Sequence, residues 1–211
     1  MKALLKESSS PKRARTDGRR LRSARTRQLV IEAYLALLRE NPTIPTAAQI
    51  ADRAGYSVRS VFERFPDLHA LRVAATDYAF GQANDQTWAT GPDGDRQARL
   101  RIHVERRARV CEQWLPLWRA LNINKGESKD LQDRIDLIRK AIIVRIEVMY
   151  GPELSTLSDK LRRQTVLAIE ALVDFESWAR MRDFFGLSFE EGCAAWIRAI
   201  DSLLPPTQAD S

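Results

Sequence analysis

The sequence predicts an all-α protein with a small N-terminal part and a larger C-terminal part, on three observations. Apolar residues recur at three- and four-residue spacing along most of the 211-residue chain, which is the period of an amphipathic helix. Thr46 with Gln49 and Ser188 with Glu191 match the capping box that opens a helix. Glycines and prolines such as Gly55 separate the periodic segments and mark where helices end.

Composition narrows the class of protein. Apolar residues make up 44% of the chain and charged residues 29%, which suffices for a core with a charged surface. The N-terminus lacks the apolar run of a secretory signal, and no run of 18 apolar residues occurs. We therefore expect a soluble cytoplasmic protein. Cys111 and Cys193 lie inside helical patterns without metal-ligand spacing, and we expect buried thiols rather than a disulfide.

Catalysis is not expected. The sequence shows no nucleophile with a base and an orienting group, and no glycine-rich phosphate loop. With two histidines, the sequence offers few ligands for a catalytic metal ion. We predict neither an enzyme nor a cofactor or metal site.

The positive charge is concentrated at the N-terminal end. Residues 1–72 hold 15 Lys and Arg against 7 Asp and Glu, a net charge of +8, whereas residues 73–211 hold 19 against 21, a net charge of −2. A basic excess confined to one end of a chain indicates that a polyanion docks there.

The stretch from Thr46 to Arg64 has the pattern of two short helices joined by a tight turn. The capping box of Thr46 opens the first helix, and Gly55 suits the left-handed residue that ends it. Ser57 can cap a second helix over about 58–65, which Pro66 ends. This is the skeleton of a helix-turn-helix, whose second helix enters the major groove of DNA.

The second of these helices carries the predicted base contacts. Arg59 and Ser60 lie in its first turn, where Arg can bridge guanine O6 and N7 and Ser can donate or accept. Phe62 has two interpretations, a core residue on the inner face or an aromatic edge against DNA. The residues predicted to contact DNA are Arg25, Arg27, Thr46, Ser57, Val58, Arg59, Ser60, Phe62 and Arg64.

The segment before this motif comprises a basic arm and a helix. Residues 1–20 have too few apolar residues for a core, so we expect an arm that is disordered in isolation. It either follows the DNA or serves only as a solubilising tail. The helix is expected over about 21–39, within a DNA-binding domain of residues 21–72. The basic residues of the arm are Lys12, Arg13, Arg15, Arg19 and Arg20.

Residues 73–205 are predicted to form a second, larger helical domain, followed by a loose tail over 206–211. A fourth helix capped by Asp67 connects the two domains. Pro116 is expected to kink the helix near 95–123. Further helices are expected near 131–149, as one long helix over about 157–185, and from Ser188 to about Leu204.

Residues 27–71 resemble the DNA-binding domain of the TetR family of transcriptional regulators. Two positions depart from the family pattern. Leu68 stands where the family often has a phosphate-binding Lys, and Phe62 stands where it usually has Tyr. The resemblance rests on Thr46, Ile50, Ala51, Arg53, Ala54, Gly55, Ser57, Phe62, Phe65 and Leu71.

The final helices carry more apolar side chains than one packing face needs, which favours a partner surface. The resemblance implies that this pair forms a four-helix dimer interface; the alternative is a fully internal pair in a monomer. The residues assigned to the interface are Trp178, Phe185, Ala194, Ile197 and Ile200.

The resemblance also implies that the middle helices enclose an effector pocket; the alternative for these residues is a filled helical core. His103 either orients a ligand or lies at the surface. The predicted pocket residues are His103, Trp114, Trp118, Met149, Tyr150 and Phe175.

Together these features predict a regulator, typically a repressor, that binds a palindromic DNA operator as a homodimer and is released by a small, largely apolar effector. The alternative is a helix-turn-helix protein without a small-molecule effector that acts with a protein partner.

Overall fold

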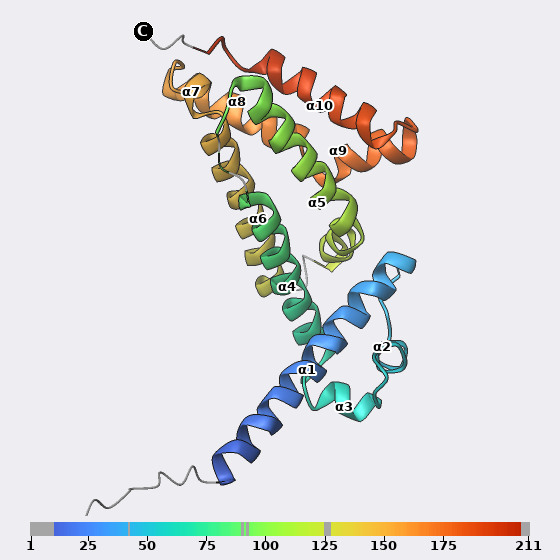
Figure 1. The fold of residues 1–211 in the computed structure, drawn as a ribbon. Coiled ribbons are helices and arrows are strands. Elements are labelled where there is room, and N and C mark those ends of the chain that lie inside the picture. The colour runs from blue at the N-terminus through green and yellow to red at the C-terminus, as the bar shows by residue number, and fades with distance from the viewer. Residues whose placement is uncertain (1–10, 42, 90, 92, 125–127, 208–211) are drawn as a thin grey trace, which may run out of the picture. The chain divides into compact units, whose positions relative to one another are not determined.

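The computed structural model describes residues 11–41, 43–89, 91, 93–124 and 128–207, and these residues form helices without any strand (Figure 1). The predicted all-α fold is therefore confirmed. The helices are α1 Pro11–Glu40, α2 Ala47–Ala54, α3 Val58–Phe62, α4 Leu68–Trp88, α5 Arg96–Asn124, α6 Lys129–Met149, α7 Gly151–Leu154, α8 Asp159–Leu172, α9 Phe175–Ala179, the π-helical turn η2 Arg180–Phe184, and α10 Phe189–Leu203.

The helices fall into two compact units, Met1–Ala75 and Thr76–Ser211. Helix α4 belongs to both, because the division lies after its eighth residue, Ala75. Among the described residues, none of the helices combines the length and the apolar character that crossing a membrane requires.

The core of the first unit lies between α1, α2, α3 and the start of α4. Arg53 of α2 donates to both carboxylate oxygens of Glu40 at the end of α1, at 2.7 and 2.5 Å. This bidentate pair is exposed, so it aligns the helices more than it stabilises them. The buried apolar side chains of this core are Val30, Ile31, Ala33, Tyr34, Leu35, Leu38, Ile50, Ala51, Val61, Phe65, Leu71, Ala74 and Ala75.

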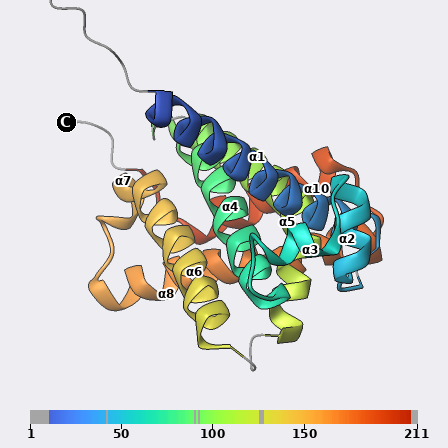
Figure 2. The same ribbon diagram turned by 90° about the horizontal axis from the view of Figure 1, so that it is seen from below.

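Helix α1 begins at Pro11, so the expectation of a disordered arm is wrong for residues 11–20. Proline suits the first turn of a helix, where its missing N–H has no intrahelical partner to lose. Lys, Arg and Ala, which dominate this stretch, are good helix formers and can extend a helix that the core has already nucleated. Residues 1–10 of the predicted arm lie outside the described part of the chain. In Figures 1 and 2 the described part of the arm is the first third of α1.

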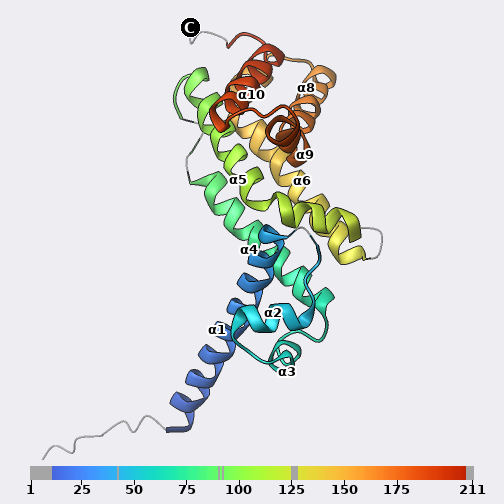
Figure 3. The ribbon, with the colours of Figure 1, turned by 90° about the vertical axis from the view of Figure 1, so that its right-hand side faces the viewer.

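In the second unit α4, α5 and α6 are linked by side chains. Arg134 of α6 donates to both carboxylate oxygens of Asp77 on α4, at 2.7 and 2.9 Å. Helix α5 contains Pro116 and changes direction along its length in Figure 3, as the sequence predicts. Proline removes one intrahelical hydrogen bond and its ring crowds the preceding turn, which is a recognised cause of a bend.

The single long helix expected over about 157–185 is wrong. Helix α8 ends at Leu172, and Asp174 then caps α9 by accepting from the backbone N–H of Glu176 at 3.2 Å. The break leaves the carbonyl of Val173 without a helical donor, and Nε of Arg107 donates to it at 2.8 Å. A buried side chain from another helix therefore supplies the hydrogen bond that this carbonyl lacks at the break.

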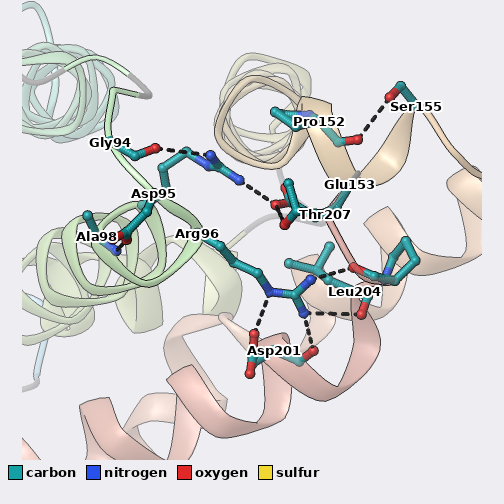
Figure 4. Close-up of polar contacts among 12 residues, drawn as sticks. Gly94, Asp95, Arg96, Ala98, Pro152, Glu153, Ser155, Asp201, Leu204 and Thr207 are labelled. Atoms are coloured by element: carbon teal, nitrogen blue, oxygen red, sulfur yellow. Dashed lines mark hydrogen bonds and ion pairs between the residues drawn. The ribbon is translucent and has the colours of Figure 1, made fainter. Parts of the chain in front are cut away.

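Polar contacts tie the C-terminal end of α10 to the start of α5 and to α7 (Figure 4). Arg96 donates to the side chain of Asp201 at 2.6 Å and to the carbonyls of Asp201 at 2.7 Å and Leu204 at 3.2 Å. It thus satisfies carbonyls that the helix end leaves open. Thr207 donates to the buried carboxylate of Glu153 at 2.6 Å. The predicted loose tail is therefore held at Thr207, and its residues 208–211 lie outside the described part.

Candidate functional site

The turn between α2 and α3 has the geometry that its sequence predicts. Thr46 and Gln49 form a complete capping box, with the two backbone N–H bonds at 2.8 and 3.3 Å. Gly55 has φ of 73°, the left-handed conformation that favours glycine. Ser57 caps α3 by accepting from the backbone N–H of Ser60 at 3.1 Å. These contacts fix the direction in which α3 leaves the turn.

Helix α3 ends at Phe62, three residues before the end expected from the sequence. A turn continues the chain, in which the backbone N–H groups of Arg64 and Phe65 both donate to the carbonyl of Val61 at 3.0 Å. Pro66 explains the early end, because it disfavours a helical conformation for Phe65 and has no N–H to donate.

The outward face of α3 presents polar and apolar groups together. The side chain of Arg59 is 89% exposed, and its Nε donates to Glu63 one turn later at 3.2 Å. An exposed ion pair of this kind contributes little to stability, so Arg59 can leave Glu63 for another acceptor at small cost. Phe62 is 42% exposed, which contradicts its interpretation as a core residue on the inner face. Val58 is also exposed.

Basic side chains flank this face within the first unit. Arg20 and Arg25 on α1 are exposed. The guanidinium of Arg27 lies 4.8 Å from the centre of the Phe65 ring, a cation–π contact that holds it beside the end of α3. Arg64 is half-buried, with Nη1 3.8 Å from Glu63. The side chains of Lys12, Arg13, Arg15 and Arg19 lie outside the described part of the structure.

Tyr56 is a candidate that the sequence interpretation missed. It lies in the turn between Gly55 and Ser57, is 37% exposed, and accepts from Thr26 through its hydroxyl at 3.4 Å. An exposed aromatic with a hydroxyl at this position can contact a phosphate. Its place directly after the turn glycine was the signal that could have found it.

The second unit contains a cavity of about 80 Å³ between α4, α5, α6 and the start of α9. This is several times the roughly 10–15 Å³ in which one water fits, so the cavity has room for a small organic molecule. His103, Trp114, Trp118 and Phe175, four of the six predicted pocket residues, line it. The other lining residues are Thr76, Ala79, Phe80, Ala83, Asn84, Thr87, Trp88, Arg106, Arg107, Val110, Leu117, Leu121, Ile138, Ala141, Ile142 and Arg145.

His103 lies inside the fold, which contradicts its interpretation as a surface residue. It is 3% exposed, and its Nδ1 lies 2.7 Å from the hydroxyl of Tyr150. Tyr150 and Met149 are buried but do not line the cavity, so their assignment as lining residues is wrong. Met149 is the last residue of α6 and Tyr150 is its C-cap. Tyr150 contacts the lining residue His103.

The pKa of His103 is lowered to about 3 by burial and by the positive charges of Arg145 and Arg107. In the folded protein the imidazole is therefore neutral at neutral pH. Burial raises the pKa of Tyr150, so this residue stays a phenol that can donate to Nδ1. In that arrangement the ring proton of His103 is on Nε2.

Lowering the pH should destabilise the fold through His103. The unfolded chain has a histidine pKa near 6.5. Between about pH 6.5 and 3, His103 is therefore protonated in the unfolded state and neutral in the folded state. The free energy of unfolding should fall with decreasing pH by up to about 1.4 kcal/mol per pH unit from this residue. Urea unfolding across this range should show a smaller slope for His103→Gln, and equal slopes in both proteins would contradict the prediction.

Several solved structures with the same arrangement of helices are those of transcriptional regulators. A TetR-family transcriptional regulator from Streptomyces coelicolor matches with a TM-score of 0.70 at 21% identity, over 85% of this chain and 80% of that chain. The chain has the fold of the TetR family. A TetR transcription regulator from Haloarcula marismortui matches with a TM-score of 0.69 at 16% identity, over 86% and 100%. A transcriptional regulator from Rhodococcus sp. matches this TetR-like chain with a TM-score of 0.69 at 14% identity, over 84% and 95%. No family model and no curated protein sequence matches.

In this TetR-like fold the predicted interface residues do not share one surface. Trp178 is 1% exposed and Ile200 is 0% exposed, because both pack into the core of the second unit. Their assignment to a partner surface is therefore wrong. Phe185 is 61% exposed and Ala194 is exposed, whereas Ile197 is half-buried.

An exposed apolar surface does exist on α8, η2 and α10. A shallow groove of small side chains lies between α8 and α10, with Ala168 and Ala171 on one side and Ala199 and Ser202 on the other. Large apolar side chains are exposed on the same elements: Leu161, Leu167, Phe184, Phe185 and Leu203. Small residues of this kind let another helix approach closely.

Proposed function

We propose that this protein is a DNA-binding transcriptional regulator of the TetR type. The observation that carries the proposal is the α2–α3 turn, in which the Thr46 capping box, the left-handed Gly55 and the Ser57 cap leave Arg59 exposed in the first turn of α3, with Ser60 half-buried beside it. A recognition helix makes its base contacts from this turn. The regulators that share this fold support the proposal.

In this proposal the phosphate contacts come from α1 and from the turn. Arg25 and Arg27 are exposed on α1, and Tyr56 can add a hydroxyl contact. Together they offset the absence of a lysine at Leu68. Phosphate contacts contribute equally to the binding of every DNA sequence, whereas Arg59 and Ser60 would discriminate between sequences.

The protein acts in this proposal as a homodimer. The apolar surface of α8, η2 and α10 would be covered by the same surface of a second copy, which gives a self-complementary, two-fold interface. Two copies of α3 about 34–36 Å apart would then read successive major grooves of a palindromic operator. The apo dimer would act as a repressor.

A small molecule in the cavity would release the operator. One face of α4 between Thr76 and Trp88 lines the cavity, and the same helix begins in the DNA-binding unit at Leu68. A ligand that favours another position of α4 would change the separation of the recognition helices. A coupling of about 1–3 kcal/mol would lower operator affinity 5–150-fold. The presence of a cavity favours this over the alternative, a regulator without an effector.

The proposal predicts different effects for two exposed arginines. Arg59→Ala should lower the preference for an operator over random DNA by about 1–3 kcal/mol, because one base contact is lost. Arg25→Ala is the matched control. It should weaken binding to operator and random DNA equally and reduce the salt dependence of binding. Fluorescence anisotropy at several salt concentrations measures both. An unchanged preference in Arg59→Ala would remove its base-reading role.

A further inference from the structure

The cavity of the second unit has an apolar wall that also carries three arginines. Arg106 and Arg107 belong to α5, and Arg145 belongs to α6. Among the described residues that line it there is no aspartate or glutamate. His103, the remaining titratable group of the wall, is neutral at neutral pH. The wall is therefore positively charged.

Arg107 is the most informative of these side chains. It is 8% exposed, its Nε donates to the carbonyl of Val173 at 2.8 Å, and its guanidinium lies 4.5 Å from the centre of the Phe175 ring. Within the described part of the chain its Nη2 has no hydrogen-bond partner. A buried guanidinium donor without an acceptor is unfavourable, so a ligand that supplies an acceptor there is favoured.

Two of the arginines contact the C-terminal part of α4. The guanidinium of Arg145 is 4.8 Å from the centre of the Trp88 ring, near the end of α4. Arg106 donates to the carbonyl of Gln86, two residues earlier on the same helix. Arg107 lies over Phe175 instead, and Arg107 and Arg145 both lower the pKa of His103, so both of their positive charges act on that imidazole.

Most of the rest of the wall is apolar, with Thr76, Asn84 and Thr87 as uncharged polar members. On α5, which runs at about 1.5 Å per residue, Trp118 lies three turns beyond Arg107. The ring of Trp118 stacks on Phe175 with centroids 4.8 Å apart. A ligand that contacts both the arginines and this wall needs a negatively charged group and an apolar body. The apolar part of the wall is formed by Trp114, Leu117, Trp118, Leu121, Ile138 and Ile142.

We propose that the cavity binds a small organic acid, with its carboxylate on Arg107 and Arg145 and its apolar body against Trp114 and Trp118. A carboxylate matches the planar fork of a guanidinium and can accept two parallel hydrogen bonds from it. His103 adds a neutral donor when Tyr150 donates to its Nδ1. The proposal rests on the effector cavity of the proposed function and adds the charge of the ligand that enters it.

Matched acids and amides test the charge directly. The probes are benzoate, 4-phenylbutyrate and octanoate, each with its amide, together with 4-phenylbutylamine. Quenching of tryptophan fluorescence reports binding, because Trp88, Trp114 and Trp118 line the cavity. At least one acid should bind about tenfold or more tightly than its amide, since hydrogen bonds to charged groups are the strong ones. The amine should not bind.

Three variants assign the preference to residues. Arg107→Met should remove the preference for the acid and leave amide binding unchanged. Arg101→Met is the matched control, because Arg101 is exposed on the same helix and does not line the cavity. Asn84→Asp adds a negative charge at an exposed lining position, so it should fold normally. It should weaken acid binding and not amide binding, which keeps the test valid if Arg107→Met does not fold.

Several results would overturn the proposal. These are the absence of any acid that binds more tightly than its amide, an amine that binds, an acid preference that survives Arg107→Met, and no acid bound at about 1 mM. The assay contains no DNA, so it is independent of the proposed regulatory role. A protein that binds the acid but no DNA would refute the proposed function and leave the cavity inference standing.

Discussion

Replacing Arg99 by methionine is expected to lower the free energy of unfolding by about 3–5 kcal/mol, the usual cost of removing one partner of a buried ion pair. Arg99 is 6% exposed and Glu153 is 0% exposed, and Nη2 of Arg99 donates to Oε1 of Glu153. Without Arg99 the carboxylate keeps, among the described residues, the hydrogen bond of Thr207, which donates to the same oxygen at 2.6 Å. Urea unfolding followed by circular dichroism measures the change.

Two controls separate the lost charge partner from lost packing. The double variant Arg99→Met with Glu153→Leu should be more stable than Arg99→Met alone, because no charge is left buried. Lys129→Met breaks an exposed ion pair with Asp133 and should leave the unfolding midpoint unchanged. A double variant less stable than Arg99→Met would contradict the ion-pair explanation.

Replacing Trp178 by alanine is expected to cost about 3–5 kcal/mol of unfolding free energy. Trp178 is 1% exposed, and its ring centre lies 4.8 Å from that of Trp196 and 5.6 Å from that of Phe189. It also packs directly on the backbone of α10 at Gly192, where a Cβ would come within 2.9 Å of the indole. Removing the ring leaves a cavity that these neighbours cannot fill without moving.

Phe185→Ala is the matched comparison for Trp178→Ala. Phe185 is 61% exposed, so its removal should change the unfolding free energy of the isolated chain little. If Phe185 belongs to the dimer interface, its removal should instead weaken self-association in sedimentation velocity. A large loss of stability in Phe185→Ala, with a small one in Trp178→Ala, would contradict the burial described for this end of the fold.

Local signals explain why the DNA-binding unit could be predicted from the sequence. Thr46 with Gln49, Gly55 and Ser57 act within one turn of the backbone, so residue type and spacing define the conformation without reference to the rest of the chain. Ser188 with Glu191 predicts the start of α10 for the same reason. The exposure of Arg59 follows from the apolar spacing around it.

Long-range contacts explain what the sequence did not show. The break between α8 and α9 depends on Arg107, a residue 66 positions before Val173 whose Nε bonds its carbonyl. No local sequence pattern predicts a hydrogen-bond partner so distant in the chain. Apolar content shows that a helix face is buried, but it does not show whether the same chain or a second copy covers that face. For this reason the assignment of Trp178 and Ile200 to a partner surface is wrong.

The charge of the cavity had a weak signal that was missed. Arg107 follows His103 by four residues and precedes Trp114 by seven, so all three lie on one face of α5. An arginine at an apolar-face position of a helix indicates a buried charge with a specific partner. The aromatic residues of the sequence predict the apolar part of the wall and not its arginines.

Selection of bound sites from random double-stranded DNA tests the central claim most directly. The claim is that the α2–α3 motif reads DNA sequence, through Arg59 and Ser60, in a two-fold dimer. The expected result is one enriched motif with inverted half-sites, in which Arg59→Ala loses selection at the same position of each half-site. Uniform recovery of all sequences, or a motif that Arg59→Ala leaves unchanged, would contradict the claim.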